Sequence, residues 1–245
     1  MVKIVPAWQL FDSYRFNEAV EAYKRQLREG PDDEWANMAG LGKSLIAVGE
    51  YAEAIPYLEK VDEYEHRLPG RPGQAVQLSV CHWMFGERMR ALDIIKMLAI
   101  GVRDRKIYYA DFSGGASYGL ILCYMAATLN LSSDVDLALK YLTKLATRDR
   151  IHSWPGPAAL FLLDRLPFED AIKGATGFAD LPRAKQAAEQ DLMTRRRLTN
   201  ILFAAGVARR LAGDEPWCRT YMAECASLTN PLVEYVWYLA KGEVA

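Results

Sequence analysis

A repeat with a period of about 35 residues constrains the fold of this chain more than any other feature. The segment RFNEAVEAYKRQL, which begins at Arg15, returns as EYAEAIPYLEKV at Glu50, as GERMRALDIIKML at Gly86 and as DVDLALKYLTKL at Asp134. A small residue holds the same place in each copy: Ala19, Ala54, Ala91 and Ala138. A fifth, weaker copy is marked by Gly206, Gly213, Cys218 and Met222.

The repeated pattern predicts pairs of packed helices. Apolar residues at i, i+3, i+4 and i+7 form one face of a helix, and the small residue among them lets two helices cross closely. Gly49 and Gly86 precede two copies, where glycine ends a helix in a left-handed turn at low cost. Further amphipathic helices are predicted at Glu34–Val48, Gln74–Phe85, Gly115–Asn130 and Leu192–Leu211. The sequence therefore predicts an all-α fold of stacked αα-hairpins.

On these residues the chain resembles the tetratricopeptide-repeat family. The best unit runs from Trp35 to His66 and matches the small and large positions of the family at Leu41, Gly42, Leu45, Gly49, Glu50, Tyr51, Ala54 and Leu58. The resemblance covers residues 13–150, and more weakly 192–231. It implies a single helical domain over residues 1–245, an α-solenoid whose repeat region is 1–150. The linkers Arg67–Gly73 and Gly101–Asp111 are longer than the tight turns of the family.

Residues 151–181 depart from the repeat and are expected to form an irregular helical insertion. Prolines near its start predict a short helix over Gly156–Leu166, and Pro167 precedes a second one. The segment 182–245 is predicted to hold a long helix, a final hairpin and a C-terminal capping helix at Pro231–Lys241. The long helix either continues from Pro182 to Leu211 or breaks near Asp191.

Composition indicates a soluble protein and a reducing compartment. The four cysteines lie in apolar helical patterns without a CxxC pair, no apolar run approaches the ~20 residues that span a bilayer, and no signal-peptide pattern precedes Pro6. We therefore expect a cytoplasmic protein. The net charge of −1 is unevenly spread: residues 1–70 carry 13 acidic against 8 basic residues, and residues 71–245 carry 18 against 22. This asymmetry is either ordinary fluctuation or an acidic end offered to a basic partner.

The stretch DFSGGASYGL, from Asp111 to Leu120, raises the question of a phosphate-binding loop. It matches neither GxxxxGK[ST] nor GxGxxG. Asp111 and Ser113 are good N-cap residues for a helix that begins near Gly114. Small residues every four positions, at Gly115, Gly119 and Cys123, favour close helix packing. Anion binding by the free N–H groups of this helix start stays open as the alternative.

No catalytic, cofactor or metal site is predicted. Of the three histidines, His66 follows Glu63 and Glu65 without the further partners that a metal site needs, His82 fits the interior of a helix, and His152 precedes Ser153 and Trp154. No GxSxG, HExxH or reactive-cysteine pattern occurs. We therefore expect no enzyme; if the chain were one, the polar corner of Asp111, His152 and Ser153 would be the first place to test.

Two basic stretches raise the question of nucleic-acid binding. Arg195, Arg196 and Arg197 lie on the long helix, where Arg195 roughly shares a face with Arg209 and Arg196 with Arg210. A second stretch holds Lys140, Lys144, Arg148 and Arg150. Both fit a solvated helix face with local ion pairs. The near-zero net charge argues against a nucleic-acid partner, although helical solenoids can hold one.

A solenoid of helix pairs would present a concave face lined by the first helix of each pair. By the repeat geometry of the family, the predicted partner-binding residues are Lys43, Trp83, Met84, Tyr118, Phe203, Arg196 and Arg210. Large aromatics and arginine are common anchors of protein interfaces. For Trp83 and Phe203, a place in the core is the equal alternative.

A second resemblance bears on the partner. The segments CHWMFGERMRAL, YADFSGGASYGL, SWPGPAALFLL and VEYVWYLAKGE are similar to those of bacterial helical-repeat proteins encoded near polymorphic toxin genes. This resemblance implies an immunity protein that binds and neutralises one cognate toxin by blocking its active site. The acidic first 70 residues would suit a basic toxin such as a nuclease. The alternatives are a scaffold or chaperone that holds peptides, an enzyme, and a nucleic-acid-binding solenoid.

Overall fold

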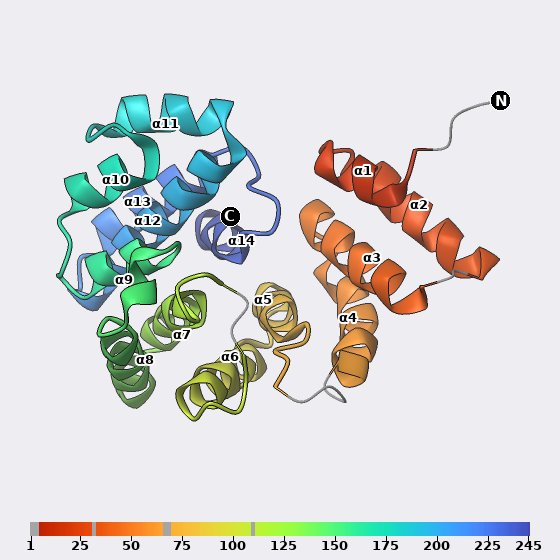
Figure 1. Ribbon diagram of the computed structural model, residues 1–245, viewed down its shortest axis with the longest axis horizontal. Coiled ribbons are helices and arrows are strands. Elements are labelled where there is room, and N and C mark those ends of the chain that lie inside the picture. Colours follow the sequence, from red (N-terminus) through yellow and green to blue (C-terminus); the bar gives the residue numbers. More distant parts are fainter. Residues whose placement is uncertain (1–4, 31–32, 66–69, 109–110) are drawn as a thin grey trace. The chain divides into compact units, whose positions relative to one another are not determined.

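The computed structural model describes residues 5–30, 33–65, 70–108 and 111–245. These residues form helices and connecting turns, with no strand among them (Figure 1), so the predicted all-α fold is confirmed. The first helices are α1 (Ala7–Asp12), α2 (Phe16–Glu29), α3 (Glu34–Val48), α4 (Tyr51–Glu65), α5 (Ala75–Phe85), α6 (Arg88–Arg103), α7 (Ala116–Thr128) and α8 (Ser132–Leu145). They are followed by the 3-10 turn η1 (Asp149–His152) and by α9 (Gly156–Leu162), α10 (Phe168–Thr176), α11 (Leu181–Gln190), α12 (Leu192–Leu211), α13 (Glu215–Ser227) and α14 (Tyr235–Val244).

The chain divides into two compact units, Met1–Ile94 and Ile95–Ala245. We call them the N-terminal unit and the C-terminal unit. Their boundary falls inside α6. The expectation that residues 1–245 form one domain stays a prediction.

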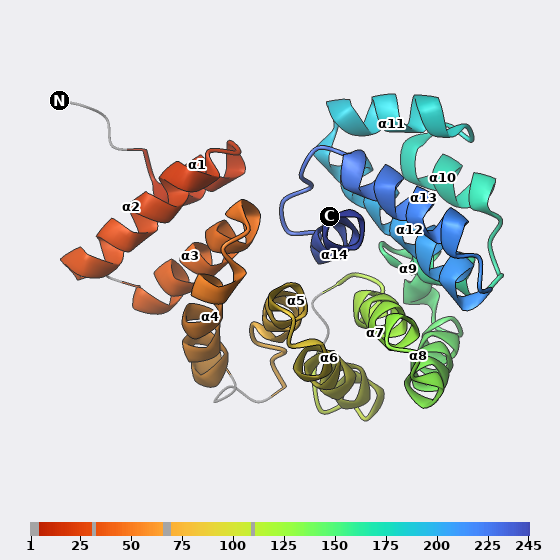
Figure 2. The same cartoon turned by 180° about the vertical axis from the view of Figure 1, so that it is seen from behind.

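In the N-terminal unit, consecutive helices pack as hairpins: α2 on α3, α3 on α4 and α4 on α5. Figure 1 and the reverse view in Figure 2 show α2, α3 and α4 in succession. Close approach depends on glycine: a Cβ atom on Gly42 of α3 would lie 2.5 Å from Leu58 of α4. Gly49 and Gly86 end α3 and α5 with φ of 89° and 96°, which confirms the predicted left-handed turns.

The C-terminal unit repeats the same packing. The hairpins α7–α8 and α12–α13 each pair a glycine on the first helix with a large residue on the second. A Cβ on Gly206 of α12 would lie 2.7 Å from Met222 of α13, and one on Gly119 of α7 would overlap Leu142 of α8. Leu58, Leu142 and Met222 occupy matching places in the sequence repeat, so the same kind of helix contact recurs in three hairpins.

The irregular insertion forms short helices that pack against α12. Both α9 and α10 contact α12, and α9 ends at Leu162, earlier than the predicted Leu166. The long helix breaks at Asp191, whose side chain accepts a hydrogen bond from the Thr194 N–H and caps α12. The structure thus gives two helices where the sequence allowed either one or two.

The last helix, α14, packs against α13 and α12. It begins at Tyr235 instead of the predicted Pro231 because the preceding residues form a turn. In that turn, Leu232 has a φ of 62° and donates its N–H to the Asn230 side chain. None of the described helices combines the length and the apolar character that crossing a membrane requires.

Candidate functional site

The predicted concave-face residues divide by burial. Tyr118, Trp83 and Phe203 are buried in the core. The ring of Phe203 packs against Tyr124, and the guanidinium of Arg88 lies over Trp83. These three side chains therefore lack the exposed surface that a partner would contact, so the core alternative holds for Trp83 and Phe203. The structure leaves Lys43 and Met84 partly exposed.

Arg210 belongs to a polar network inside the C-terminal unit. Its side chain is 10% exposed. The guanidinium donates to Glu243 of α14 at 2.6 Å, to Glu215 of α13 at 2.9 Å and to Thr128 of α7 at 2.6 Å. Burial alone would lower the pKa of Arg210, but the hydrogen bonds to both carboxylates raise it. Arg210 is thus a cross-link between helices.

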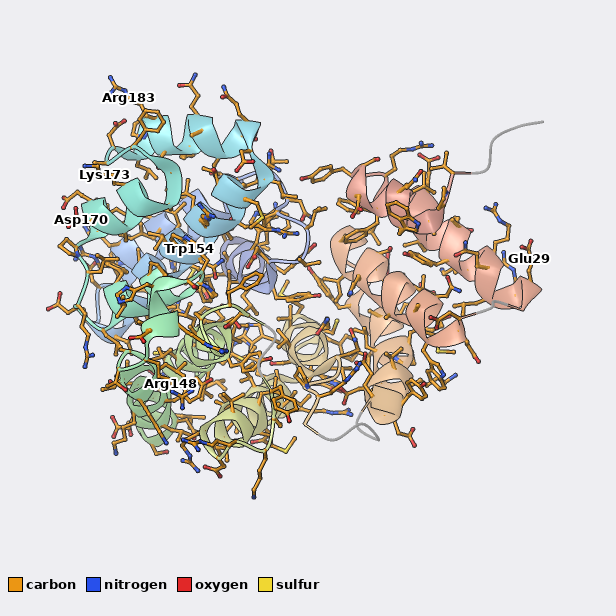
Figure 3. All side chains as sticks on the ribbon, in the orientation of Figure 1. Glu29, Arg148, Trp154, Asp170, Lys173 and Arg183 are labelled. Atoms are coloured by element: carbon orange, nitrogen blue, oxygen red, sulfur yellow. The ribbon has the colours of Figure 1, made fainter. Side chains whose placement is uncertain are left out.

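The arginine run of α12 is also engaged within the unit. Arg195 is buried and donates to the Ala188 and Glu189 carbonyls, which satisfies the C-terminal end of α11. Arg196 donates to the Pro231 carbonyl. The guanidinium of Arg197 lies 5.9 Å from the centre of the ring of Trp154, which is labelled in Figure 3. Arg195, Arg196 and Arg197 thus contact backbone carbonyls and an aromatic ring of the same unit, instead of forming the solvated helix face that the sequence suggested.

The glycine-rich stretch is a helix cap built around Asp111. One carboxylate oxygen accepts from the Gly115 N–H and from Ser113, and the other accepts from the Ser117 N–H and hydroxyl. The helix begins at Ala116, slightly later than predicted, because Gly115 holds a left-handed conformation. Since the Asp111 carboxylate already occupies the N–H groups at this helix start, an external anion would have to displace it.

The polar corner proposed for an enzyme does not assemble in the described structure. His152 and Ser153 are exposed, and neither has a hydrogen bond to Asp111, whose oxygens serve the helix cap. His82 is buried, with Nδ1 2.7 Å from Glu87 Oε2. His66 lies outside the described residues. Among the residues that the structure describes, no three histidine, cysteine or carboxylate side chains are placed to hold a metal ion.

All four cysteines are free thiols in the core. Burial raises the pKa of Cys81 and of Cys123 to about 12 and that of Cys218 to about 11. It also raises the pKa of Cys225. These thiols stay protonated at neutral pH, so they lack the thiolate that nucleophilic chemistry requires.

An exposed cluster in the N-terminal unit was missed by sequence reasoning. Trp35, at the start of α3, stacks on Tyr64, at the end of α4, with ring centres 4.3 Å apart and an interplanar angle of 6°. Acidic residues that neighbour Trp35 and Tyr64 in the sequence lie at the same two helix ends, the start of α3 and the end of α4. We call this cluster the acidic–aromatic patch: Asp33, Glu34, Trp35, Asp62, Glu63, Tyr64 and Glu65.

The end of α4 is acidic, although negative charge at a helix C-terminus opposes the helix dipole. Two of these carboxylates accept hydrogen bonds from Gln74, just before α5. Its N–H donates to Asp62 at 2.7 Å, and its side-chain amide donates to Glu65 at 3.0 Å. Asp33 caps α3 through the Ala36 N–H. Tyr64 remains 38% exposed, so the patch offers an aromatic ring within a negative surface.

The signal for this patch was present in the sequence as two short acidic runs, one beside Trp35 and one around Tyr64. The two runs come together because of the length of the α3–α4 hairpin, and the repeat pattern alone does not predict this contact.

Comparison of the chain with protein-family models gives no match, and comparison with curated proteins finds no significant relative.

Proposed function

We propose that this chain is a protein-interaction module of the bacterial cytoplasm that binds and neutralises a cognate toxin, as an immunity protein does. The observation that carries the proposal is the acidic–aromatic patch. Trp and Tyr are typical hot-spot residues, and surrounding carboxylates would attract a basic protein and raise its association rate. The resemblance to proteins encoded near toxin genes supplies the kind of partner.

The distribution of charge favours this patch over the α12 arginines as the partner surface. The guanidinium groups of Arg195 and Arg210 are committed to internal contacts. Glu34 is exposed at the start of α3, beside the Trp35–Tyr64 stack. An electrostatic contact of this kind weakens with salt, because the Debye length is only about 8 Å at physiological ionic strength.

The test begins with capture of partners from the native host by the tagged chain, followed by growth assays. A single partner that is toxic when expressed alone and harmless with this chain would support the proposal. The double variant Glu34→Lys/Tyr64→Ala should lose both capture and protection. The matched control is Glu21→Lys/Trp8→Ala, which changes the charge equally and removes an exposed aromatic from α1.

Two outcomes would contradict the proposal. Capture of several short peptides at weak affinity would favour a scaffold or chaperone, the second candidate function. Equal loss of protection in both double variants, with unchanged folding, would show that the acidic–aromatic patch has no special role. A tight complex that forms at an unchanged rate in high salt would remove the electrostatic part of the argument.

A further inference from the structure

A second exposed surface, in the C-terminal unit, concentrates positively charged side chains. Two cations lie after α6, two on α8 and one after α8, and exposed rings stand nearby. We call this surface the basic–aromatic patch: Arg105, Lys106, Lys140, Lys144, Arg148, Tyr108 and Phe112. None of its five cations forms an ion pair with a described residue. This separates the patch from the α12 arginines, most of whose donors are engaged.

Several observations bring these residues together. Lys140 and Lys144 are one helical turn apart, about 6 Å along the axis of α8, and Arg148 follows at the end of that helix (Figure 3). A hydrogen bond from Arg103, together with the charges of Lys106 and Lys144, lowers the pKa of Asp104. Lys144 of α8 is therefore within electrostatic range of the turn after α6.

The turn that carries Arg105 and Lys106 is fixed to the end of α6. The N–H groups of Lys106 and Ile107 donate to the Gly101 carbonyl at 2.8 and 3.1 Å, and the Ile107 side chain occupies the space beside Gly101. Arg105 has a φ of 60°, where glycine would be the low-cost residue. The protein thus holds two exposed cations in a defined position instead of on a loose loop.

Two aromatic rings accompany the cations. Tyr108 is 70% exposed and Phe112 is 80% exposed. Phe112 lies between Asp111 and Ser113, which are anchored by the helix-cap hydrogen bonds of α7. The cap in turn lies beside α8, because the Tyr141 hydroxyl donates to the Gly115 carbonyl at 2.9 Å.

Helix dipoles explain only part of this arrangement. A cation in the last turn of a helix is stabilised by about 0.3–1 kcal/mol, which accounts for Lys144 on α8. It does not account for Lys140, which lies a turn earlier, or for two largely exposed rings. Exposed rings beside cations form the kind of surface on which unpaired bases stack.

We propose that the basic–aromatic patch binds single-stranded nucleic acid. The cations would contact phosphates, and Tyr108 and Phe112 would stack on unpaired bases. A duplex would satisfy the cations but leave the rings unused, because its base faces are covered. An acidic peptide would also pair with the cations, but it carries no base that would stack on the two exposed rings. The near-zero net charge of the chain does not oppose this binding, since the local charge of the patch determines the contact.

The experiment is a fluorescence-anisotropy titration of the full chain against a labelled oligothymidylate of about 15 nucleotides. With about four phosphate contacts, the affinity should fall about 50-fold between about 50 and 200 mM salt. The triple variant Lys106→Glu/Lys140→Glu/Lys144→Glu should lose at least about tenfold in affinity, and Tyr108→Ala should lose about tenfold. Circular dichroism and the thermal midpoint verify that each variant is folded.

The matched control is Lys173→Glu/Arg183→Glu/Arg219→Glu, which changes the net charge by the same amount at exposed sites on α10, α11 and α13. Lys173 and Arg183 are labelled in Figure 3. This control should retain most of the binding. An equal loss in both triple variants would mean nonspecific attraction and would overturn the proposal. So would the absence of binding at low salt, or equal affinity for polyglutamate without any effect of Tyr108→Ala.

This binding is independent of the proposed protein partner. Glu34→Lys/Tyr64→Ala, which tests the acidic–aromatic patch, should leave oligothymidylate affinity unchanged. Either proposal can therefore fail while the other stands.

Discussion

The side chain of Leu142 in α8 fills the space that a Cβ atom on Gly119 of α7 would need. Tyr141 flanks the same point, and its hydroxyl bonds to the Gly115 carbonyl one turn earlier on the facing helix. The small residues of the glycine-rich stretch therefore set the distance between the two helices. They are packing residues, and the cap around Asp111 completes their structural role.

Replacing Gly119 should destabilise the protein even when the new side chain is small. In Gly119→Ala, the added methyl group would force Leu142 and Tyr141 to move, at a cost of about 1–3 kcal/mol. Gly174→Ala is the control, because Gly174 lies inside α10 with no atom within 4 Å of an added Cβ. That change should be neutral or stabilising by up to about 1 kcal/mol. Chemical denaturation measures both, and equal effects would contradict the packing argument.

The polar network around Arg210 leads to a second prediction about the free energy of unfolding. Arg210→Met would leave Glu243 partly buried without its cation and should cost about 3 kcal/mol. Arg209→Met, on the adjacent residue, removes only an exposed pair with Asp214 at 3.5 Å and should cost no more than about 1 kcal/mol. Denaturant titration at neutral pH compares the two variants. A similar small loss in both would mean that the network adds little beyond packing.

His82 predicts loss of stability under mildly acidic conditions. Burial, followed by the charge of Arg90, lowers its pKa, and this outweighs the opposing effect of the hydrogen bond to Glu87. The folded state therefore binds fewer protons than the unfolded state, in which the pKa is about 6.5. Stability is retained above that pH and falls below it, by at most about 1.4 kcal/mol per pH unit.

The check is the free energy of unfolding of His82→Gln between about pH 7.5 and 5. Its pH dependence should be flatter than that of the wild type over this window. His152→Gln, which alters an exposed histidine, should keep the wild-type slope. If the free energy of unfolding changes with pH in the same way for His82→Gln and the wild type, proton uptake by His82 does not control acid sensitivity.

Much of the fold could be predicted because the repeat is encoded locally. Apolar spacing and the glycine that follows it placed α3 at its observed bounds, Glu34–Val48, and apolar spacing placed the end of α12 at Leu211, although its start at Leu192 was one of two alternatives. The partner surface was harder to predict, because helix periodicity does not show which residues on the outer face of one helix are covered by a neighbouring helix. Phe203 is covered by packing that includes Tyr124, and Arg210 is held by Glu243, which lies 33 residues away in the chain.

Trp35 and Tyr64 illustrate the opposite difficulty. Each fits an ordinary helix-end position, and their stacking depends on where α3 begins relative to the end of α4. A shift of one residue in either helix would move the ring on that helix by about 100° around the helix axis. Contacts of this kind require a three-dimensional structure.

Glu234 predicts a pH effect of opposite sign to that of His82. Burial raises its pKa, as does the nearby charge of Asp111, although a hydrogen bond from Asn200 and the charge of Arg196 oppose the shift. A carboxyl group with a raised pKa favours the folded state below its unfolded pKa of about 4.3, and this contribution is lost as the pH rises through the folded value. Ionisation of Glu234 thus weakens the fold as the pH rises above about 4.3.

Glu234→Gln keeps the shape of the side chain and an oxygen that can accept from Asn200, but it cannot ionise. We expect its thermal midpoint to exceed that of the wild type at about pH 8 and the difference to shrink towards about pH 4. Glu169→Gln, at an exposed position on α10, serves as the control and should show no such trend. A lower midpoint for Glu234→Gln at every pH would mean that the ionised carboxylate supports the start of α14, so that charge there stabilises the fold.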